Sequence, residues 1–205
     1  MNLSPQAMTA RKQNIYLVGM PGAGKSTVGK ALARQLGLTF VDADQVLIEQ
    51  VGASIATIFE FEGEAGFRQR ESKIIAELCL RREIVLATGG GAILRDENRS
   101  ALRANGIVIY LHANLDHLAQ RTRHDARRPL LSQAGDPRET LKNMLVAREP
   151  FYRGVSDLVV ETGRQSIGKM VQHIVHALNT QNLWQPSAMA IQTETNATTT
   201  LPTSQ

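Results

Sequence analysis

Residues 19–27 read GMPGAGKST and combine three glycines with a lysine and two hydroxyl side chains. Their spacing fits the phosphate-binding pattern G-x-x-x-x-G-K-[ST], in which backbone N–H groups gather around phosphate oxygens. Lys25 adds a cation, and Ser26 offers a hydroxyl oxygen to Mg²⁺. The apolar run NIYLV, which is typical of a strand, precedes the segment, and a helical pattern follows it. This strand–loop–helix context is the one in which the phosphate-binding pattern occurs, and it argues against a chance glycine turn. We therefore predict a nucleotide-phosphate site at Gly22, Ala23, Gly24, Lys25, Ser26 and Thr27.

Two aspartates, Asp42 and Asp44, follow the second strand-like run in the sequence FVDAD. In an extended segment alternate side chains face the same way, so both carboxylates are expected to point toward the phosphates. One would hold Mg²⁺ through water, and the other would accept a proton from an attacking hydroxyl. Taken alone, DAD is typical of a solvated acidic turn. Its position after a strand, beside the phosphate loop, favours the functional interpretation.

Two other segments carry unusual residue types. Gly89, Gly90 and Gly91 follow the third strand-like run, and their expected use is a close approach of the backbone to a ligand. Arg68 and Glu71 are neighbours at i, i+3 on a predicted helix. Such a pair is usually a surface ion pair of small energetic value.

A basic segment, RTRHDARRPLL, contains four arginines in eight positions: Arg121, Arg123, Arg127 and Arg128. These cations repel one another unless a polyanion is present. We interpret residues of about 122–137 as a mobile lid over a triphosphate, with Arg128, beside Pro129, at the transferring phosphate. A solvated basic loop is the alternative interpretation.

The elements that must position these residues alternate in type. Strand-like runs are at 15–18, 39–41, 84–87, 107–111 and 158–160, and helical patterns cover 26–36, 46–50, 55–61, 67–81, 96–104, 114–124, 138–148 and 166–178. This alternation predicts an α/β fold with a parallel sheet covered by helices on both faces. Ligands of such sheets bind at the carboxyl ends of the strands, which is where the phosphate loop, the aspartates and the three glycines fall.

Bulk composition narrows the class of protein. The 205 residues suffice for one well-cored domain, expected over residues 14–180, with a flexible segment at 1–13 and a disordered, threonine-rich tail at 181–205. The formal charge of +4 suits polyanionic small substrates, because no nucleic-acid motif is present and the basic residues are dispersed. Cys79 is the only cysteine, which excludes an internal disulfide. We expect a cytoplasmic monomer with no membrane partner, since no apolar stretch is long enough to span a bilayer and no signal peptide is recognisable.

Six segments together resemble the shikimate kinase family: GMPGAGKSTVGKALARQLG, FVDAD, EGEAGFRQRE, LATGGGA, RRPLL and AREPFYR. They occur in the family's order between about residues 14 and 178, and FRxxE with the triple glycine and RPLL is far more specific than the phosphate loop. The resemblance implies a nucleoside-monophosphate-kinase-like P-loop NTPase fold, with a five-stranded parallel sheet and a mobile lid. It also implies transfer of the ATP γ-phosphate to the 3-hydroxyl of shikimate, with Mg²⁺, on the route to chorismate and the aromatic amino acids.

The resemblance further implies individual roles. Asp44 would contact the substrate hydroxyls and act as the base, while Arg68 and Arg148 would pair with the substrate carboxylate. Glu71 would orient its surroundings beside the backbone of Gly89, Gly90 and Gly91. The remaining implied contacts are Lys25 and Arg128 on the phosphates, Ser26 on Mg²⁺ with Asp42 acting through water, and Arg121 and Gln165 near the adenine.

Two alternatives remain open at this point. The first is another small-metabolite kinase of the same fold, acting on gluconate or on a nucleotide. Paired arginines suit a compact carboxylate better than a nucleotide, and FRxxE with GGG favours shikimate over gluconate. The second is a non-catalytic nucleotide-binding module, against which the presence of Lys25, Asp44 and Arg68 argues.

Overall fold

A single parallel sheet forms the centre of the protein. The computed structural model describes residues 14–122, 136–163 and 165–184. Its five strands lie in the order β2-β3-β1-β4-β5, and every neighbouring pair is parallel. They are β1 (Asn14–Val18), β2 (Thr39–Asp42), β3 (Ile84–Ala87), β4 (Gly106–Ala113) and β5 (Leu158–Thr162). The predicted α/β architecture with a five-stranded parallel sheet is confirmed.

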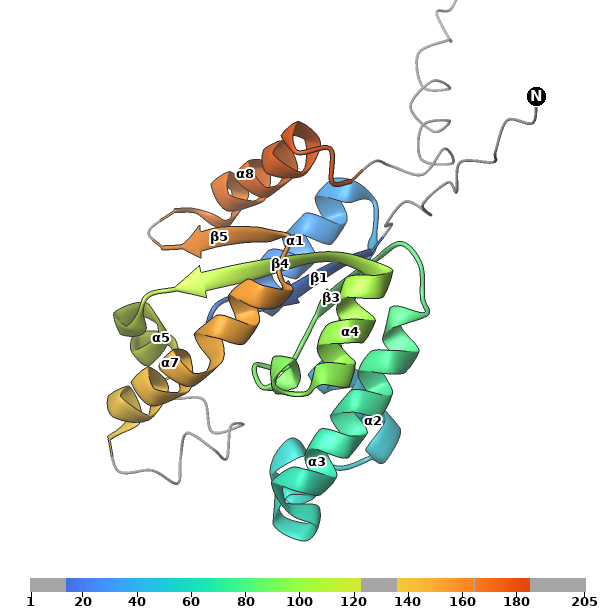
Figure 1. Ribbon diagram of the computed structural model, residues 1–205, viewed down its shortest axis with the longest axis vertical. Helices are drawn as coiled ribbons and strands as arrows, with labels where there is room; N and C mark the ends of the chain where they lie inside the picture. Colours follow the sequence, from blue (N-terminus) through green and yellow to red (C-terminus); the bar gives the residue numbers. More distant parts are fainter. Residues whose placement is uncertain (1–13, 123–135, 164, 185–205) are drawn as a thin grey trace, which may run out of the picture.

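Helices cover both faces of this sheet (Figure 1). On one face α1 packs against α8, while α4 and α7 cover the other face and α3 packs against α4. The helices are α1 (Lys25–Leu36), α2 (Ala43–Val51), α3 (Ile55–Cys79), α4 (Asp96–Asn105), α5 (Leu115–Thr122), α7 (Pro137–Val155) and α8 (Ile167–Thr180), with a short 3₁₀ turn η1 (Ala92–Leu94). Within the described residues, none of these helices combines the length and the hydropathy that crossing a membrane requires.

The central position of β1 brings the polar segments together. All five of its residues are buried, between β3 on one side and β4 on the other. Thr88, directly after β3, donates both its backbone N–H and its hydroxyl to the carbonyl of Leu17, at 3.2 Å and 3.1 Å. Because the strands are parallel, the residues that follow β1, β2 and β3 meet at the same edge of the sheet.

Helix α2 begins earlier than the apolar pattern predicts. It starts at Ala43 rather than at residue 46, because the Asp42 side chain caps it by accepting the N–H groups of Asp44 at 3.1 Å and Gln45 at 3.4 Å. The expectation that Asp42 and Asp44 belong to one extended segment is therefore wrong. Asp42 ends the strand, and Asp44 lies in the first helical turn.

Helix α7 is longer than predicted. It continues from Arg148 through Pro150 to Val155, whereas the sequence pattern ended it at Arg148. Proline disfavours a helix interior because its ring clashes with the preceding turn. Here the added turn buries Tyr152 completely and leaves Val155 only 2% exposed, and this tertiary burial outweighs the local cost.

The folded part of the chain extends beyond the expected boundary at residue 181. Leu183 donates its N–H to the carbonyl of Leu178 at 2.9 Å, and Trp184 is 8% exposed within the hydrophobic core. Residues 181–184 therefore belong to the domain, and the rest of the predicted tail, 185–205, lies outside the described residues, as do residues 1–13.

We expect Trp184→Ala to lower the free energy of unfolding by about 3 kcal/mol, because it removes a large side chain from the core. The measurement is urea denaturation. Leu80→Ala is the matched control, since Leu80 is 79% exposed and its truncation should cost less than about 0.5 kcal/mol. Equal stabilities of the two variants would contradict the revised boundary.

Candidate active site

The loop between β1 and α1 has the geometry of a phosphate cradle. Gly22 and Gly24 have positive φ angles of 81° and 96°, which side chains disfavour, so the backbone can turn sharply toward the helix. Gly24 is the N-cap of α1, so no side chain caps the first N–H groups of this helix. The positive end of the helix dipole therefore points at the space that the loop encloses.

Lys25 is folded back onto this loop. Its ammonium group donates to the carbonyls of Gly19 at 2.8 Å and Met20 at 3.0 Å, and the residue is 6% exposed. These bonds satisfy hydrogen-bond donors of a buried cation. The lysine is thus held at the phosphate end of the cleft, on a side chain long enough to exchange loop carbonyls for phosphate oxygens.

Ser26 and Asp42 form an oxygen pair beside the same loop. The Ser26 hydroxyl donates to Asp42 Oδ2 at 2.6 Å, while Oδ1 of the same carboxylate caps α2. Hydroxyl and carboxylate oxygens are the ligands that Mg²⁺ prefers. Within residues 14–122, 136–163 and 165–184 no cluster of three or more His, Cys, Asp or Glu residues forms a metal site.

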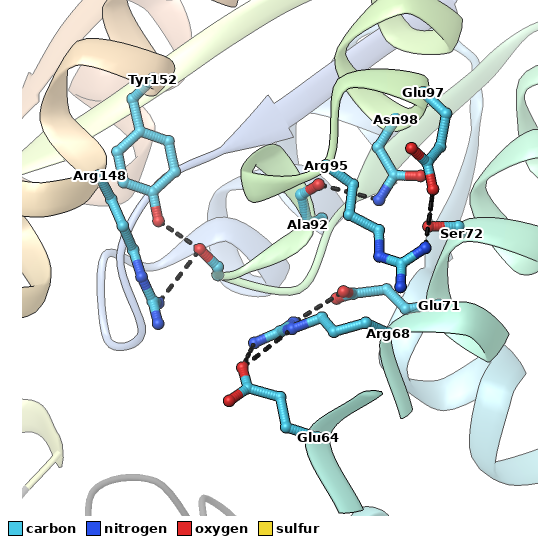
Figure 2. Close-up of polar contacts among 11 residues, drawn as sticks. Glu64, Arg68, Glu71, Ser72, Ala92, Arg95, Glu97, Asn98, Arg148 and Tyr152 are labelled. Carbon is cyan, nitrogen blue, oxygen red and sulfur yellow. Dashed lines mark hydrogen bonds and ion pairs between the residues drawn. The ribbon is translucent and has the colours of Figure 1, made fainter. Parts of the chain in front are cut away.

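Arg68 and Glu71 form a buried ion pair on α3. Arg68 Nη1 donates to Glu71 Oε2 at 2.7 Å, and Nη2 contacts the more exposed Glu64 at 3.2 Å (Figure 2). Arg68 and Glu71 are 8% and 3% exposed. This spacing by itself is typical of a surface ion pair, whereas the structure buries the pair against Gly89 and Gly91 of the glycine loop.

Burial determines the ionisation of this pair. Desolvation raises the pKa of Glu71, against the opposing effect of Arg68, and the nearby Asp44 carboxylate raises it further. Desolvation alone would lower the pKa of Arg68, but its interactions with Glu71 and Glu64 together outweigh this and hold the pKa above its ordinary value. Oε1 of Glu71 is buried and has no hydrogen-bond partner among the described residues. The pair is therefore held at a cost to stability.

The three glycines after β3 leave room for charged side chains. A Cβ atom at Gly89 would collide with Oε1 of Glu71 and would lie 3.0 Å from Oδ1 of Asp44, and one at Gly91 would collide with the Arg68 guanidinium. A Cβ at Gly90 would meet the ring of Pro21 in the phosphate loop at 2.8 Å. The loop thus packs closely against the ion pair through Gly89 and Gly91 and against the phosphate loop through Gly90, which residues with side chains could not do.

Helix α7 contributes the last charged group. Arg148 is 7% exposed, and its Nη1 donates to the carbonyl of Gly90 at 3.4 Å. Figure 2 shows Arg148 and Tyr152 on one side of the glycine loop and Arg68 with its two glutamates on the other. Two guanidinium groups from different helices therefore lie near the glycine loop and line the same cleft, an arrangement suited to binding one carboxylate.

One cleft of about 1740 Å³ connects these parts. Arg121 lies at the phosphate-loop end of the cleft, where its Nη1 donates to the carbonyl of Gly22 at 3.3 Å. Gln165 also lines the cleft, whereas Arg128 and most of the expected lid, residues 123–135, lie outside the described residues. The predicted site residues on the cleft wall are Gly22, Ala23, Gly24, Lys25, Ser26, Thr27, Asp42, Asp44, Arg68, Glu71, Gly89, Gly90, Gly91, Arg121, Arg148 and Gln165.

Sequence reasoning missed two features of this site. Pro21 supports Gly90, and Tyr152 donates its hydroxyl to the Gly90 carbonyl at 2.5 Å. Tyr152 stands four residues after Arg148, so a helix continued past Pro150 would have placed both on one face. The contact of Pro21 with a loop about 70 positions away along the chain has no local signal.

Comparison with known proteins agrees with this geometry. The family model described as "Shikimate kinase" matches residues 21–179. The chain belongs to the shikimate kinase family. The shikimate kinase of Chromobacterium violaceum is 49% identical over 172 residues, which are 84% of this chain and 93% of that protein. That of Bordetella pertussis is 51% identical over 174 residues, 85% of this chain and 82% of that protein.

A solved shikimate kinase has the same fold. The structure of the Acinetobacter baumannii enzyme in complex with shikimate superposes with a TM-score of 0.81 at 44% identity. The match covers 84% of this chain and 96% of that one. As in the shikimate kinase family as a whole, this chain is an ATP-dependent kinase.

The spatial role of Gly91 can be tested directly. Gly91→Ala should displace the Arg68 guanidinium, and we expect the KM for the phosphate acceptor to rise at least ~10-fold, with the KM for ATP changed less than ~2-fold. Gly154→Ala in α7 is the control, because its Cβ meets open space and alanine favours a helix. Steady-state kinetics of both variants checks this, and unchanged kinetics for Gly91→Ala would refute it.

The raised pKa of Glu71 predicts a pH-dependent stability. The native state keeps the Glu71 proton to a higher pH than the unfolded chain, whose carboxyl titrates near the ordinary value of 4.5. Above pH 4.5 the native state therefore holds more protons than the unfolded chain does, so the stability contributed by this group falls as pH rises. Thermal unfolding between pH 4.5 and 8 should show a smaller decline of Tm for Glu71→Gln than for the unmodified protein. Parallel pH profiles would contradict the assignment.

Proposed function

We propose that the chain transfers the γ-phosphate of ATP to the 3-hydroxyl of shikimate, with the reaction carried out in the cleft between the phosphate loop and α3. The observation that carries the proposal is that Lys25, Asp44 and the Arg68–Arg148 pair line one continuous cleft. The cleft therefore offers cations for the triphosphate of ATP. It also offers a carboxylate for a hydroxyl group of shikimate and two guanidinium groups for the carboxylate of shikimate.

The nucleotide end is built for charge neutralisation. The N-terminus of α1, Lys25 and Arg128 would share the phosphate oxygens, and Arg121 and Gln165 would lie near the adenine. Ser26 and Asp42 would hold Mg²⁺, the serine directly and the aspartate through water, and the 2.6 Å contact between their oxygens supports this assignment. Bound there, Mg²⁺ supplies neutralisation of the phosphate charge.

The substrate end is built for orientation. Arg68 and Arg148 would bind the carboxylate of shikimate with charge-assisted hydrogen bonds. Glu71 holds Arg68 at 2.7 Å, and the backbone of Gly89, Gly90 and Gly91 forms the wall against which the ring would lie. With the carboxylate of shikimate held at one end of the ring, the hydroxyl groups at the other end would lie close to Asp44.

Asp44 is the proposed base. Its place in the first turn of α2 directs the carboxylate to the glycine wall, where Oδ1 lies 3.0 Å from the position of a Cβ at Gly89. There it would accept the proton of the attacking hydroxyl as the oxygen bonds to phosphorus and ADP leaves. Phosphoryl transfer depends mainly on positioning and electrostatic stabilisation, and these residues supply both.

The direct test is ADP release from Mg·ATP in the presence of shikimate, gluconate or nucleoside monophosphates. We expect turnover with shikimate only, because the paired guanidinium groups match a compact carboxylate. Release of ADP with gluconate or a nucleotide, but not with shikimate, would replace the proposal with another small-metabolite kinase. Nucleotide binding without turnover on any acceptor would indicate a non-catalytic module.

Asp44→Asn should lower kcat at least ~100-fold while the dissociation constant for ATP changes little, because the amide keeps the shape but accepts no proton. Single-turnover kinetics and nucleotide titration separate these two effects. Near-normal turnover would remove Asp44 from the role of base.

Arg68→Ala should weaken shikimate binding by roughly 1.5–3 kcal/mol, since a charged hydrogen-bond partner is lost. Arg70→Ala is the matched control on the same helix. Arg70 pairs with Glu62, its side chain is 45% exposed, and its loss should change shikimate affinity less than ~2-fold. Calorimetric titration of shikimate measures both, and equal affinities would place the carboxylate elsewhere.

A further inference from the structure

The carbonyl of Gly90 accepts two side chains from α7. The Tyr152 hydroxyl donates to it at 2.5 Å, and Arg148 Nη1 donates at 3.4 Å. Tyr152 is fully buried. The phenol makes the short bond, and the guanidinium makes one at the outer limit of hydrogen-bond distance. The tyrosine is therefore the principal partner of this carbonyl.

The ring of Tyr152 has little freedom to turn away from the loop. It stacks on Tyr110 of β4 with ring centroids 4.8 Å apart and an interplanar angle of 15°. Tyr110 in turn donates its hydroxyl to Glu149 Oε2 at 2.7 Å, and Glu149 Oε1 accepts Arg153 Nε at 2.6 Å. Stacking on Tyr110, a buried residue of β4, thus fixes the ring of Tyr152 and with it the direction of the Tyr152 hydroxyl.

This bond has two consequences at the site. A buried carbonyl without a partner is costly, so loss of the hydroxyl would draw Arg148 closer to Gly90 and away from the cleft. In addition, a trans peptide holds the N–H of Gly91 opposite the carbonyl of Gly90. Tyr152 therefore also sets the direction of a backbone donor in the wall against which the Arg68 guanidinium lies.

We propose that Tyr152 is a positioning residue for the carboxylate end of the substrate site: its hydroxyl anchors the Gly90 peptide and thereby leaves Arg148 available to the substrate. The proposal rests on the function proposed above. It assigns Tyr152 no contact with the substrate and no part in the chemical step. Its effect should therefore appear in substrate binding and depend on Arg148.

The test uses the hydroxyl-only substitution Tyr152→Phe, which retains the stacked ring. We expect the dissociation constant and the KM for shikimate to rise roughly 10-fold, with kcat and the KM for ATP within ~2-fold of the unmodified enzyme. Tyr110→Phe is the matched control. It removes a buried hydroxyl from the other ring of the same stack, one that bonds Glu149 rather than Gly90, and shikimate affinity should change less than ~2-fold.

A second background separates positioning from general loosening of the fold. In Arg148→Ala, adding Tyr152→Phe should lower kcat/KM for shikimate by less than ~2-fold, because the group through which the tyrosine acts is absent. Unchanged shikimate affinity in Tyr152→Phe, an equal loss in both backgrounds, or an equal loss of ATP affinity would each overturn the proposal. If the unmodified protein does not phosphorylate shikimate, the proposed function fails, whereas normal shikimate affinity in Tyr152→Phe of an active enzyme refutes only this inference.

Discussion

The substrate half of the site depends on one buried ion pair, Arg68 with Glu71. Taking both charges out of water is expensive, and the attraction between them restores only part of that cost. Burial raises the pKa of Glu71, and its Oε1 has no hydrogen-bond partner within the part of the chain that the structure describes, both of which indicate an incompletely compensated cost. What the arrangement provides is a guanidinium group that is held in one direction before any substrate arrives, which lowers the ordering required on binding.

This pair explains the sequence of its neighbours. Gly89 and Gly91 lack side chains because the Glu71 carboxylate and the Arg68 guanidinium occupy the space. Gly90 lies against Pro21 of the phosphate loop, so the glycine loop brings the phosphate loop and the ion pair close together. Because both line one continuous cleft, a phosphate group bound at the loop and a substrate bound at Arg68 would be close enough for direct transfer. Positioning of the reactants follows from packing rather than from any single catalytic side chain.

Much of this organisation could be predicted from local pattern. The phosphate loop, the alternation of strands and helices, and the three polar segments after β1, β2 and β3 carry signals within a few residues of themselves. The rest depends on tertiary contacts. The Asp42 cap determines where α2 begins, and the burial of Tyr152 explains why α7 continues through Pro150. Apolar periodicity indicates neither of these features. The burial of the Arg68–Glu71 pair likewise follows from the glycine loop above it, which is distant in sequence.

The measurement that tests this account most directly is the dissociation constant of shikimate for Glu71→Gln, compared with Glu64→Gln. Both glutamates contact Arg68, but the side chain of Glu71 is 3% exposed and that of Glu64 is 51% exposed. If Glu71 positions Arg68, Glu71→Gln should weaken shikimate binding roughly 10-fold, and Glu64→Gln should change it less than ~2-fold. If charge alone governed binding, removing either negative charge would strengthen the binding of an anion. Tighter binding by Glu71→Gln, or equal effects of the two substitutions, would contradict the account.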